Sequence, residues 1–230
     1  MRRTALPALL ALAALAGPTR AADILVEARS KIMMPSPRIP DTIEDLRIFL
    51  GPEAALVEGG LLGTTLLRYD IEQAQLLTRS PARLRHARRS QRGAASDSPL
   101  RLQPMGETQD IAGIPCSRFM ARGVLEHSVR PQGGRSGTAL PQLELEIELW
   151  IGALPLVDPE RLAHVLVHDP HFQSLFPFSV EQLAALPGVP IRSESRQLQL
   201  GRETRAQLEL LSAAPAPEDP ARFDANTPED

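Results

Sequence analysis

The chain has 230 residues, 43% of them hydrophobic, with 28 acidic and 25 basic side chains and a net charge of −3. A chain of this length can bury a core without disulfides or metals, and the single cysteine, Cys116, has no partner for an internal disulfide. The acidic balance argues against a nucleic-acid partner, because dedicated nucleic-acid binders are usually basic. We expect one domain or two small ones, with Cys116 buried as a small hydrophobic residue.

The first 22 residues have the pattern of a secretory signal peptide. A basic start at residues 1–3 precedes an apolar run over residues 5–17, which is too short to span a bilayer, and small residues lead to a cleavage position after Ala21 or Ala22. We expect export to the periplasm, cleavage of residues 1–22 and a mature net charge of about −6. No cysteine lies near the cleavage position, so we expect neither an N-terminal lipid anchor nor a transmembrane span.

From residue 24 to residue 78 the chain reads as short strands separated by turn residues. β-branched and aromatic residues mark the strands, and prolines mark breaks because proline cannot donate to a sheet ladder. Helices and strands do not alternate here, which argues against a parallel sheet. The expected strands are Ile24–Met33, Leu46–Leu50, Ala54–Val57, Thr64–Tyr69 and Gln75–Thr78.

Arginines crowd into the next segment, which we interpret as a loop inserted into the domain at residues 80–98. No acidic residue lies between Glu72 and Asp97. Two interpretations are open. The segment is either a solvated connection, which is the commoner role of a charge run, or a patch that binds phospholipid head groups or another anionic partner. The candidate anion-binding residues are Arg83, Arg85, Arg88 and Arg89.

The most regular part of the sequence runs from Gly106 to Trp150. Two short runs meet at Ala112-Gly113 and a third follows a glycine-rich gap, which predicts a three-stranded antiparallel meander. In the third run leucine and isoleucine take every second position, so one face must be buried. We expect the opposite face to be solvated, because an exposed row of carboxylates lacks the burial that raises a catalytic pKa. That face holds Glu144, Glu146, Glu148 and Trp150.

Residues 154–186 are the only stretch with helical signals. Asp158 and Pro159 start one helix, and Ser179 starts a shorter one. Three of the chain's six phenylalanines lie between the two helices. They are either the plug that docks the helices onto the sheet or the wall of an apolar ligand groove. The candidate groove residues are Phe172, Phe176, Phe178 and Trp150.

Two histidines of the first helix, His164 and His168, lie four residues apart on one face and could bind a metal as a pair. The glutamate that follows the first histidine in metalloprotease helices is Val165 here, so that motif is incomplete. His168 also lies at the helix end, where a cation complements the helix dipole. No nucleophile elbow, phosphate-binding loop or Cys-His pair is present, so we expect no catalytic residues, no cofactor and no enzymatic activity.

After residue 188 the chain returns to strands. Ile191–Leu200 and Thr204–Leu211 should pair across Gly201-Arg202, and residues 212–230 should form an acidic, proline-rich tail with Phe223 as its anchor. The side chains expected on the inward face are Leu198, Leu200, Ala206, Leu208 and Leu210.

Several short motifs recur in the order of a known family. They are Asp-Ile-Ala-Gly-Ile-Pro-Cys-Ser-Arg-Phe from residue 110, Glu-Leu-Trp-Ile from residue 148, Pro-Gly-Val-Pro-Ile from residue 187 and Asp-Pro-Ala-Arg-Phe from residue 219. With them the chain resembles a bacterial family of exported domains with the LolA-like fold, in the superfamily of the periplasmic lipoprotein carriers and the sensor RseB. The resemblance implies, over residues 23–211, an open antiparallel half-barrel that wraps around helices and can hold an acyl chain. No position matches a carrier's acyl-contacting or gating residues, so the resemblance implies no site residue.

The sequence therefore predicts a mainly β (α+β) domain, an open curved antiparallel half-barrel with two or three short helices in its concave face. The expected function is that of a periplasmic, non-enzymatic binding module for a lipid-like or lipoprotein ligand. The alternative is a cell-envelope interaction or stress-sensing protein that binds an anionic partner through its arginine-rich loop.

Overall fold

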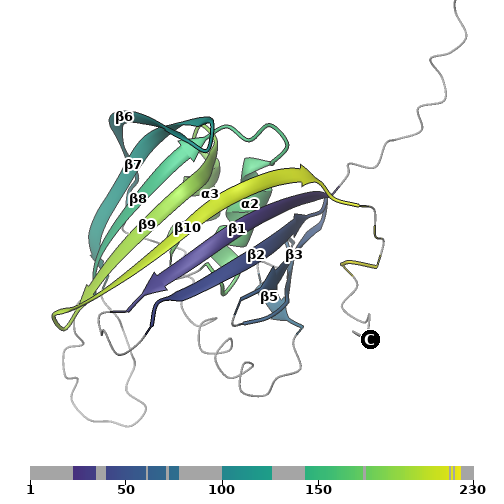
Figure 1. Ribbon diagram of the computed structural model, residues 1–230, viewed down its shortest axis with the longest axis horizontal. Coiled ribbons are helices and arrows are strands. Elements are labelled where there is room, and N and C mark those ends of the chain that lie inside the picture. The colour runs from purple at the N-terminus through teal and green to yellow at the C-terminus, as the bar shows by residue number, and fades with distance from the viewer. Residues whose placement is uncertain are drawn as a thin grey trace, which may run out of the picture.

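Alternating apolar and polar residues build ten strands in the described part of the computed structural model (Figure 1). The structure describes residues 23–34, 40–60, 62–70, 73–77, 100–125, 143–172, 175–217, 219 and 221–223. The strands are β1 (Ile24–Met33), β2 (Thr42–Leu50), β3 (Ala54–Gly59), β4 (Thr65–Arg68), β5 (Gln73–Leu76), β6 (Gln103–Ile111), β7 (Ile114–Leu125), β8 (Leu143–Gly152), β9 (Val189–Gln199) and β10 (Arg202–Pro215).

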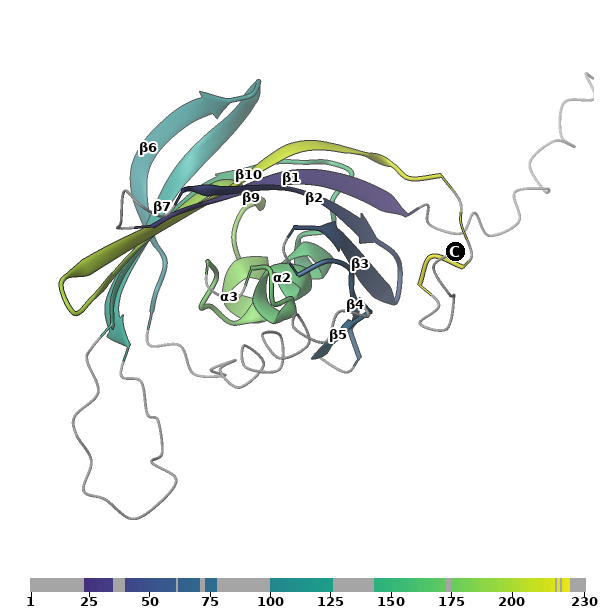
Figure 2. The ribbon, with the colours of Figure 1, turned by 60° about the horizontal axis from the view of Figure 1, so that its bottom comes forward.

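The strands form one antiparallel sheet in the order β5-β4-β3-β2-β1-β10-β9-β8-β7-β6. The last strand, β10, pairs with β1 on one side and with β9 on the other, and so joins the early strands to the central meander. Among the described residues β5 and β6 do not pair, so the sheet stays open. Figure 2 shows that it bends around the helices, which confirms the predicted open half-barrel.

Both helices begin at the residues that the sequence indicates. Helix α2 (Pro159–His168) has Asp158 as its N-cap, whose carboxylate accepts from the backbone N of Glu160 at 3.0 Å. Helix α3 (Val180–Ala184) starts with a capping box, in which Ser179 and Gln182 satisfy each other's backbone NH groups. These caps fix the ends of the two helices, which both lie under the concave face of the sheet (Figure 2).

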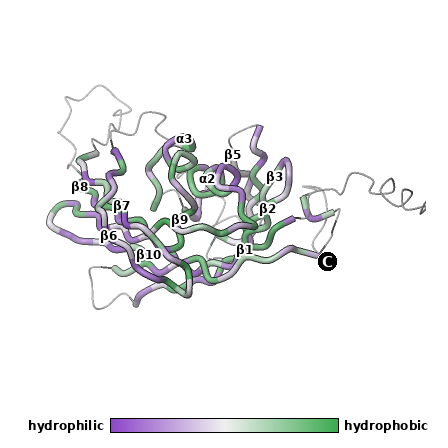
Figure 3. The backbone as a smooth tube through the Cα atoms, turned by 90° about the horizontal axis from the view of Figure 1, so that it is seen from above, coloured by the Kyte–Doolittle hydropathy of each residue, from purple (hydrophilic) through white to green (hydrophobic). Residues whose placement is uncertain are grey.

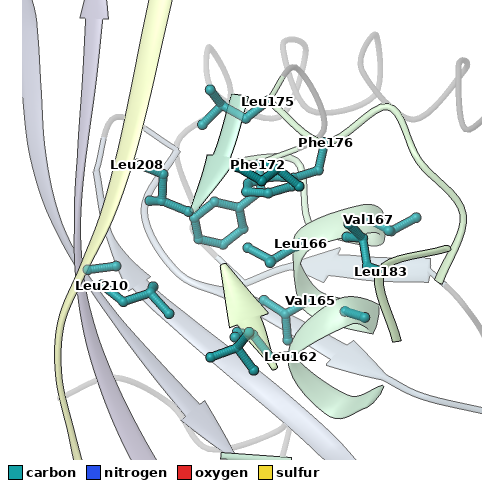
Figure 4. Close-up of a cluster of buried hydrophobic side chains, with 14 of the residues drawn as sticks. Leu162, Val165, Leu166, Val167, Phe172, Leu175, Phe176, Leu183, Leu208 and Leu210 are labelled. Carbon is teal, nitrogen blue, oxygen red and sulfur yellow. The ribbon is translucent and has the colours of Figure 1, made fainter. Parts of the chain in front are cut away.

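The core fills the space between that face and the helices. Phe172, Phe176 and Phe178 are at most 2% exposed, and they belong to the same cluster as the inward side chains of the sheet. Figure 4 shows Leu208 and Leu210 of β10 pointing towards the helical side chains. Burial of each large apolar side chain contributes about 1.5–3 kcal/mol, so the phenylalanines dock the helices onto the sheet. The face of α2 that shares in this core consists of Leu162, Ala163, Val165, Leu166 and Val167.

A second apolar cluster lies on the other face of β2, β3 and β4, where the C-terminal segment covers it. Phe49 is buried there and Phe223 packs against the cluster. The guanidinium of Arg222 lies 4.4 Å from the centre of the Phe49 ring and donates to Asp23 at 3.1 Å. Apolar contact and an ion pair therefore hold the described part of the tail against the sheet.

The sequence predicts that the outer face of the meander is solvated. In the structure its charged side chains form ion pairs between neighbouring strands. On β7 Arg118 donates to Glu148 of β8 and to Glu107 of β6, at 2.5 and 2.7 Å. Further along β7, Arg122 lies 3.1 Å from Glu146. Figure 3 shows that these strands contain both hydrophilic and hydrophobic residues. The glutamate row thus helps to fix the register of β6, β7 and β8.

The inward side of β9 differs from the expectation. The hairpin between β9 and β10 turns at Leu200 and Gly201, both with positive φ, and Leu200 is 78% exposed. Since this loop has two residues, even-numbered positions of β10 lie opposite odd-numbered positions of β9. Ala206, Leu208 and Leu210 do face inward as predicted, but their counterparts on β9 are Ser193 and Ser195, and Leu198 and Leu200 do not face the core.

Neither helix in the described part of the chain has the length and hydrophobicity needed to cross a bilayer. Cys116 is 1% exposed, as expected for a buried hydrophobic residue. Burial raises the pKa of its thiol, which keeps the group protonated and unreactive.

Replacing Phe176 with Ala should lower the free energy of unfolding by about 3–5 kcal/mol, because the helical plug loses a large buried side chain and leaves a cavity. Leu200→Ala removes apolar atoms from an exposed hairpin tip and should change the free energy of unfolding by less than about 0.5 kcal/mol. Urea unfolding followed by circular dichroism compares the two variants. Equal effects would contradict the placement of the phenylalanines in the core.

Candidate binding site in the concave face

The structure brings three of the four candidate groove residues together. Phe172, Phe176 and Phe178 all belong to the segment that links α2 to α3, and all are buried against the sheet. Figure 4 shows Phe172 and Phe176 with Leu175 above the side chains of α2. This segment and the inward side chains of the sheet form one continuous apolar layer.

Trp150, the fourth candidate, belongs to the same buried cluster as the phenylalanines, but its indole is bonded to a residue of the outer face. Its indole NH donates to Glu148 at 2.7 Å, and the Arg118 guanidinium lies 6.0 Å from the ring centre. Both partners belong to the ion-paired outer face. The alternation along β8 thus puts Trp150 on the glutamate side of the sheet.

The candidate metal pair is formed by neighbouring rings on one face of α2. The ring centres of His164 and His168 are 5.8 Å apart, and Tyr69 lies 5.6 Å from His164 on the other side. The described residues contain no group of three or more histidine, cysteine, aspartate or glutamate side chains placed to hold a metal ion. Metal binding by His164 and His168 remains a prediction from their spacing, testable by elemental analysis for zinc in the wild type and in a variant with both replaced by Ala.

A buried polar network joins the end of α2 to the sheet. Asp169, the C-cap of α2, is fully buried and accepts from the Thr65 hydroxyl of β4 and from the backbone N of His171, the latter at 2.9 Å. His171 Nδ1 lies 2.7 Å from the same carboxylate, and Nε2 lies 3.2 Å from the carbonyl oxygen of Gly59 in β3. The network anchors the phenylalanine segment to β3 and β4.

These residues hold a hydroxyl, a carboxylate and an imidazole, the three groups of a hydrolytic triad, but in a different order. In a triad the imidazole stands between the other two and takes the proton of the hydroxyl. Here the carboxylate of Asp169 stands between Thr65 and His171, and the second ring nitrogen of His171 faces a carbonyl. The imidazole therefore does not contact the Thr65 hydroxyl, and the bonds of the network join the segment to β3 and β4.

The partners of His171 favour its charged form. A carbonyl oxygen and a carboxylate can only accept, so both ring nitrogens donate when the ring is protonated. Burial acts against the charge and is the largest single effect, but Asp169, the Gly59 carbonyl and Glu44 together outweigh it and raise the pKa of His171. The His171 side chain is only 2% exposed, so the ion pair with Asp169 is shielded from solvent.

Sequence reasoning did not find this network. The run Asp169-Pro-His171 after a helix is visible in the sequence. However, Thr65 lies 104 residues from Asp169, and Gly59 lies 112 residues from His171. Its members come together only through the pairing of the early strands, which no local pattern reports.

Two predicted functional segments fall outside the described residues. They are the signal peptide at residues 1–22 and the anion-binding candidates Arg83, Arg85, Arg88 and Arg89. Both remain predictions from the sequence.

No protein-family model matches the chain, and a search of curated proteins finds no significant match. Solved structures do show similarity. PNGF-II is 11% identical with a TM-score of 0.38, over 87% of this chain and 30% of that one, so the chain spans less than a third of its length.

Two further structures match over most of both chains. A LolA superfamily protein from Nitrosomonas europaea is 12% identical with a TM-score of 0.32, covering 88% of this chain and 90% of that one. A putative outer membrane lipoprotein-sorting protein domain from Vibrio parahaemolyticus is 7% identical with a TM-score of 0.25, covering 90% and 91%.

The stability that His171 contributes should fall as the pH rises. A group whose pKa is raised on folding binds its proton more tightly in the folded state, so its contribution is complete below the unfolded value of 6.5 and is lost above the folded one. The difference in unfolding free energy between wild type and His171→Gln, measured by denaturant titration, should therefore shrink as the pH rises through 6.5 and above it. A difference that stays constant or grows would contradict a charged His171.

Proposed function

We propose that this chain is a periplasmic, non-enzymatic binding module that holds a lipid-like or lipoprotein ligand between its concave sheet and the α2–α3 segment. The observation that carries the proposal is the apolar layer formed there by Phe172, Phe176 and Phe178 with the inward side chains of the sheet. Binding sites for apolar ligands are concave, mostly apolar and provided with few polar groups. This layer is the largest apolar cluster in the described residues.

The way the layer is covered supports the same function. The cover consists of two helices of ten and five residues, whereas the floor is a ten-stranded sheet. The apolar contacts of the phenylalanine segment are non-directional, so a ligand's acyl chain can replace them. Its described polar anchors are few, namely the Asp169 network and the bond from the Gln182 side chain to the Leu100 carbonyl. A ligand can therefore take the place of the segment without disturbing the sheet.

The alternative function, in which the arginine-rich loop binds an anionic envelope partner, depends on residues 80–98. No contact of the described residues favours it over the apolar site.

Purified mature protein incubated with a bacterial lipid extract should retain a hydrophobic adduct in native mass spectrometry, and an uncharged fluorescent hydrophobic probe should bind and be displaced by the extract. Phe172→Leu keeps the concave layer apolar but weakens the contacts that the ligand has to displace, so we expect it to strengthen binding about three- to tenfold. Phe223→Leu makes the same change in the cluster on the outer face and should leave binding unchanged.

Absence of both an adduct and probe binding in the wild type would reject the proposed function. Equal changes of affinity in the two variants would mean that the ligand does not occupy the concave face.

A further inference from the structure

Strand β9 interrupts the apolar floor of the concave face with two hydroxyl groups. Its inward positions pair with apolar residues of both neighbouring strands, so each serine stands in a row of hydrophobic side chains. Ser193 lies between Leu149 of β8 and Leu208 of β10, and Ser195 lies between Ile147 of β8 and Ala206 of β10.

Both hydroxyls are buried without a partner. Ser193 is 1% exposed and Ser195 is 2% exposed, and neither Oγ atom has a hydrogen-bond partner among the residues that the structure describes. Buried polar groups in folded proteins are nearly always hydrogen-bonded, because an unsatisfied group forfeits its bonds to water. Two such groups at successive inward positions, about 6.5–7 Å apart along the strand, call for an explanation.

The buried neighbours of the two serines carry no charge. Ala206 of β10 lies opposite Ser195, and the small residues Ala28 and Ser30 lie one strand further away, on β1. The buried inward neighbours of the two serines on β8 and β10 are apolar. A buried charge needs a partner of opposite sign, so these surroundings fit a neutral hydrogen-bonding group and disfavour a free carboxylate or a phosphate.

We propose that Ser193 and Ser195 form a polar subsite in the concave face that donates hydrogen bonds to the carbonyl oxygens of an acyl ester. The inference rests on the proposed function, because the acyl chain of the ligand lies in the adjoining apolar layer. It adds the ligand class, which is a neutral acylated lipid and not a free fatty acid or a plain hydrocarbon. The serines hold the ester group, and the leucines and phenylalanines hold the chain.

The test compares two lipids that differ only at the carbonyl, a monoacylglycerol and the alkyl-ether glycerol of the same chain length. Each competes with a fluorescent hydrophobic probe bound to the full mature protein. The wild type should prefer the ester about tenfold, which corresponds to one or two hydrogen bonds. The double variant Ser193→Ala/Ser195→Ala should bind both lipids equally, and Ser212→Ala, which removes an outer-face hydroxyl bonded to Glu27, should keep the preference.

The outcomes separate this inference from the function on which it rests. If neither lipid displaces the probe from the wild type and no adduct forms, the proposed function fails. If both lipids bind the wild type equally, or the double variant still prefers the ester, the subsite is wrong while the function stands.

The ligand-free double variant supplies a second readout. Its melting temperature should equal or exceed that of the wild type, because the substitution removes unsatisfied buried groups. A fall of several degrees would show that the hydroxyls already have partners, and would overturn the subsite.

Discussion

The concave face of the bent sheet is apolar and has to be shielded from water, and in this protein the segment from α2 to α3 covers it. The inward leucines, isoleucines and valines of the sheet have no other described apolar partner of comparable size. Phe172, Phe176 and Phe178 supply the largest buried surface of that segment, and the buried Asp169–His171 pair ties it to β3 and β4. The curvature of the sheet, the docking of the helices and the proposed ligand site all depend on this one apolar contact.

The two faces of the sheet have different roles. Cross-strand ion pairs such as Arg118–Glu148 fix the strand register on the outer face, while the inner face is apolar apart from a few buried polar groups. A ligand in the concave face competes with the protein's own phenylalanines, so its affinity is lowered by the free energy needed to displace them. The network at Asp169 sets part of that free energy, and the hydroxyls of Ser193 and Ser195 lower it if the ligand satisfies them.

The sequence predicts most of the elements because their signals are local. Strand β1 matches residue for residue, since apolar alternation ends at a run of prolines, and both helices start at the predicted caps. The sequence predicts the side chains of the site less well. Leu198 and Leu200 were assigned inward because they are apolar, whereas the two-residue turn places Ser193 and Ser195 there. The network of Asp169 with Thr65 depends on pairings between distant strands, which no local pattern encodes.

Hydrogen exchange followed by mass spectrometry, with and without bound lipid, tests most directly whether the ligand and the helical segment share the concave face. Amides of residues 159–184 should change their protection when lipid binds, together with those of β9 and β10, while the ion-paired hairpin of β6 and β7 stays the same. Changes confined to that hairpin or to the C-terminal segment, with residues 159–184 unaffected, would contradict the account.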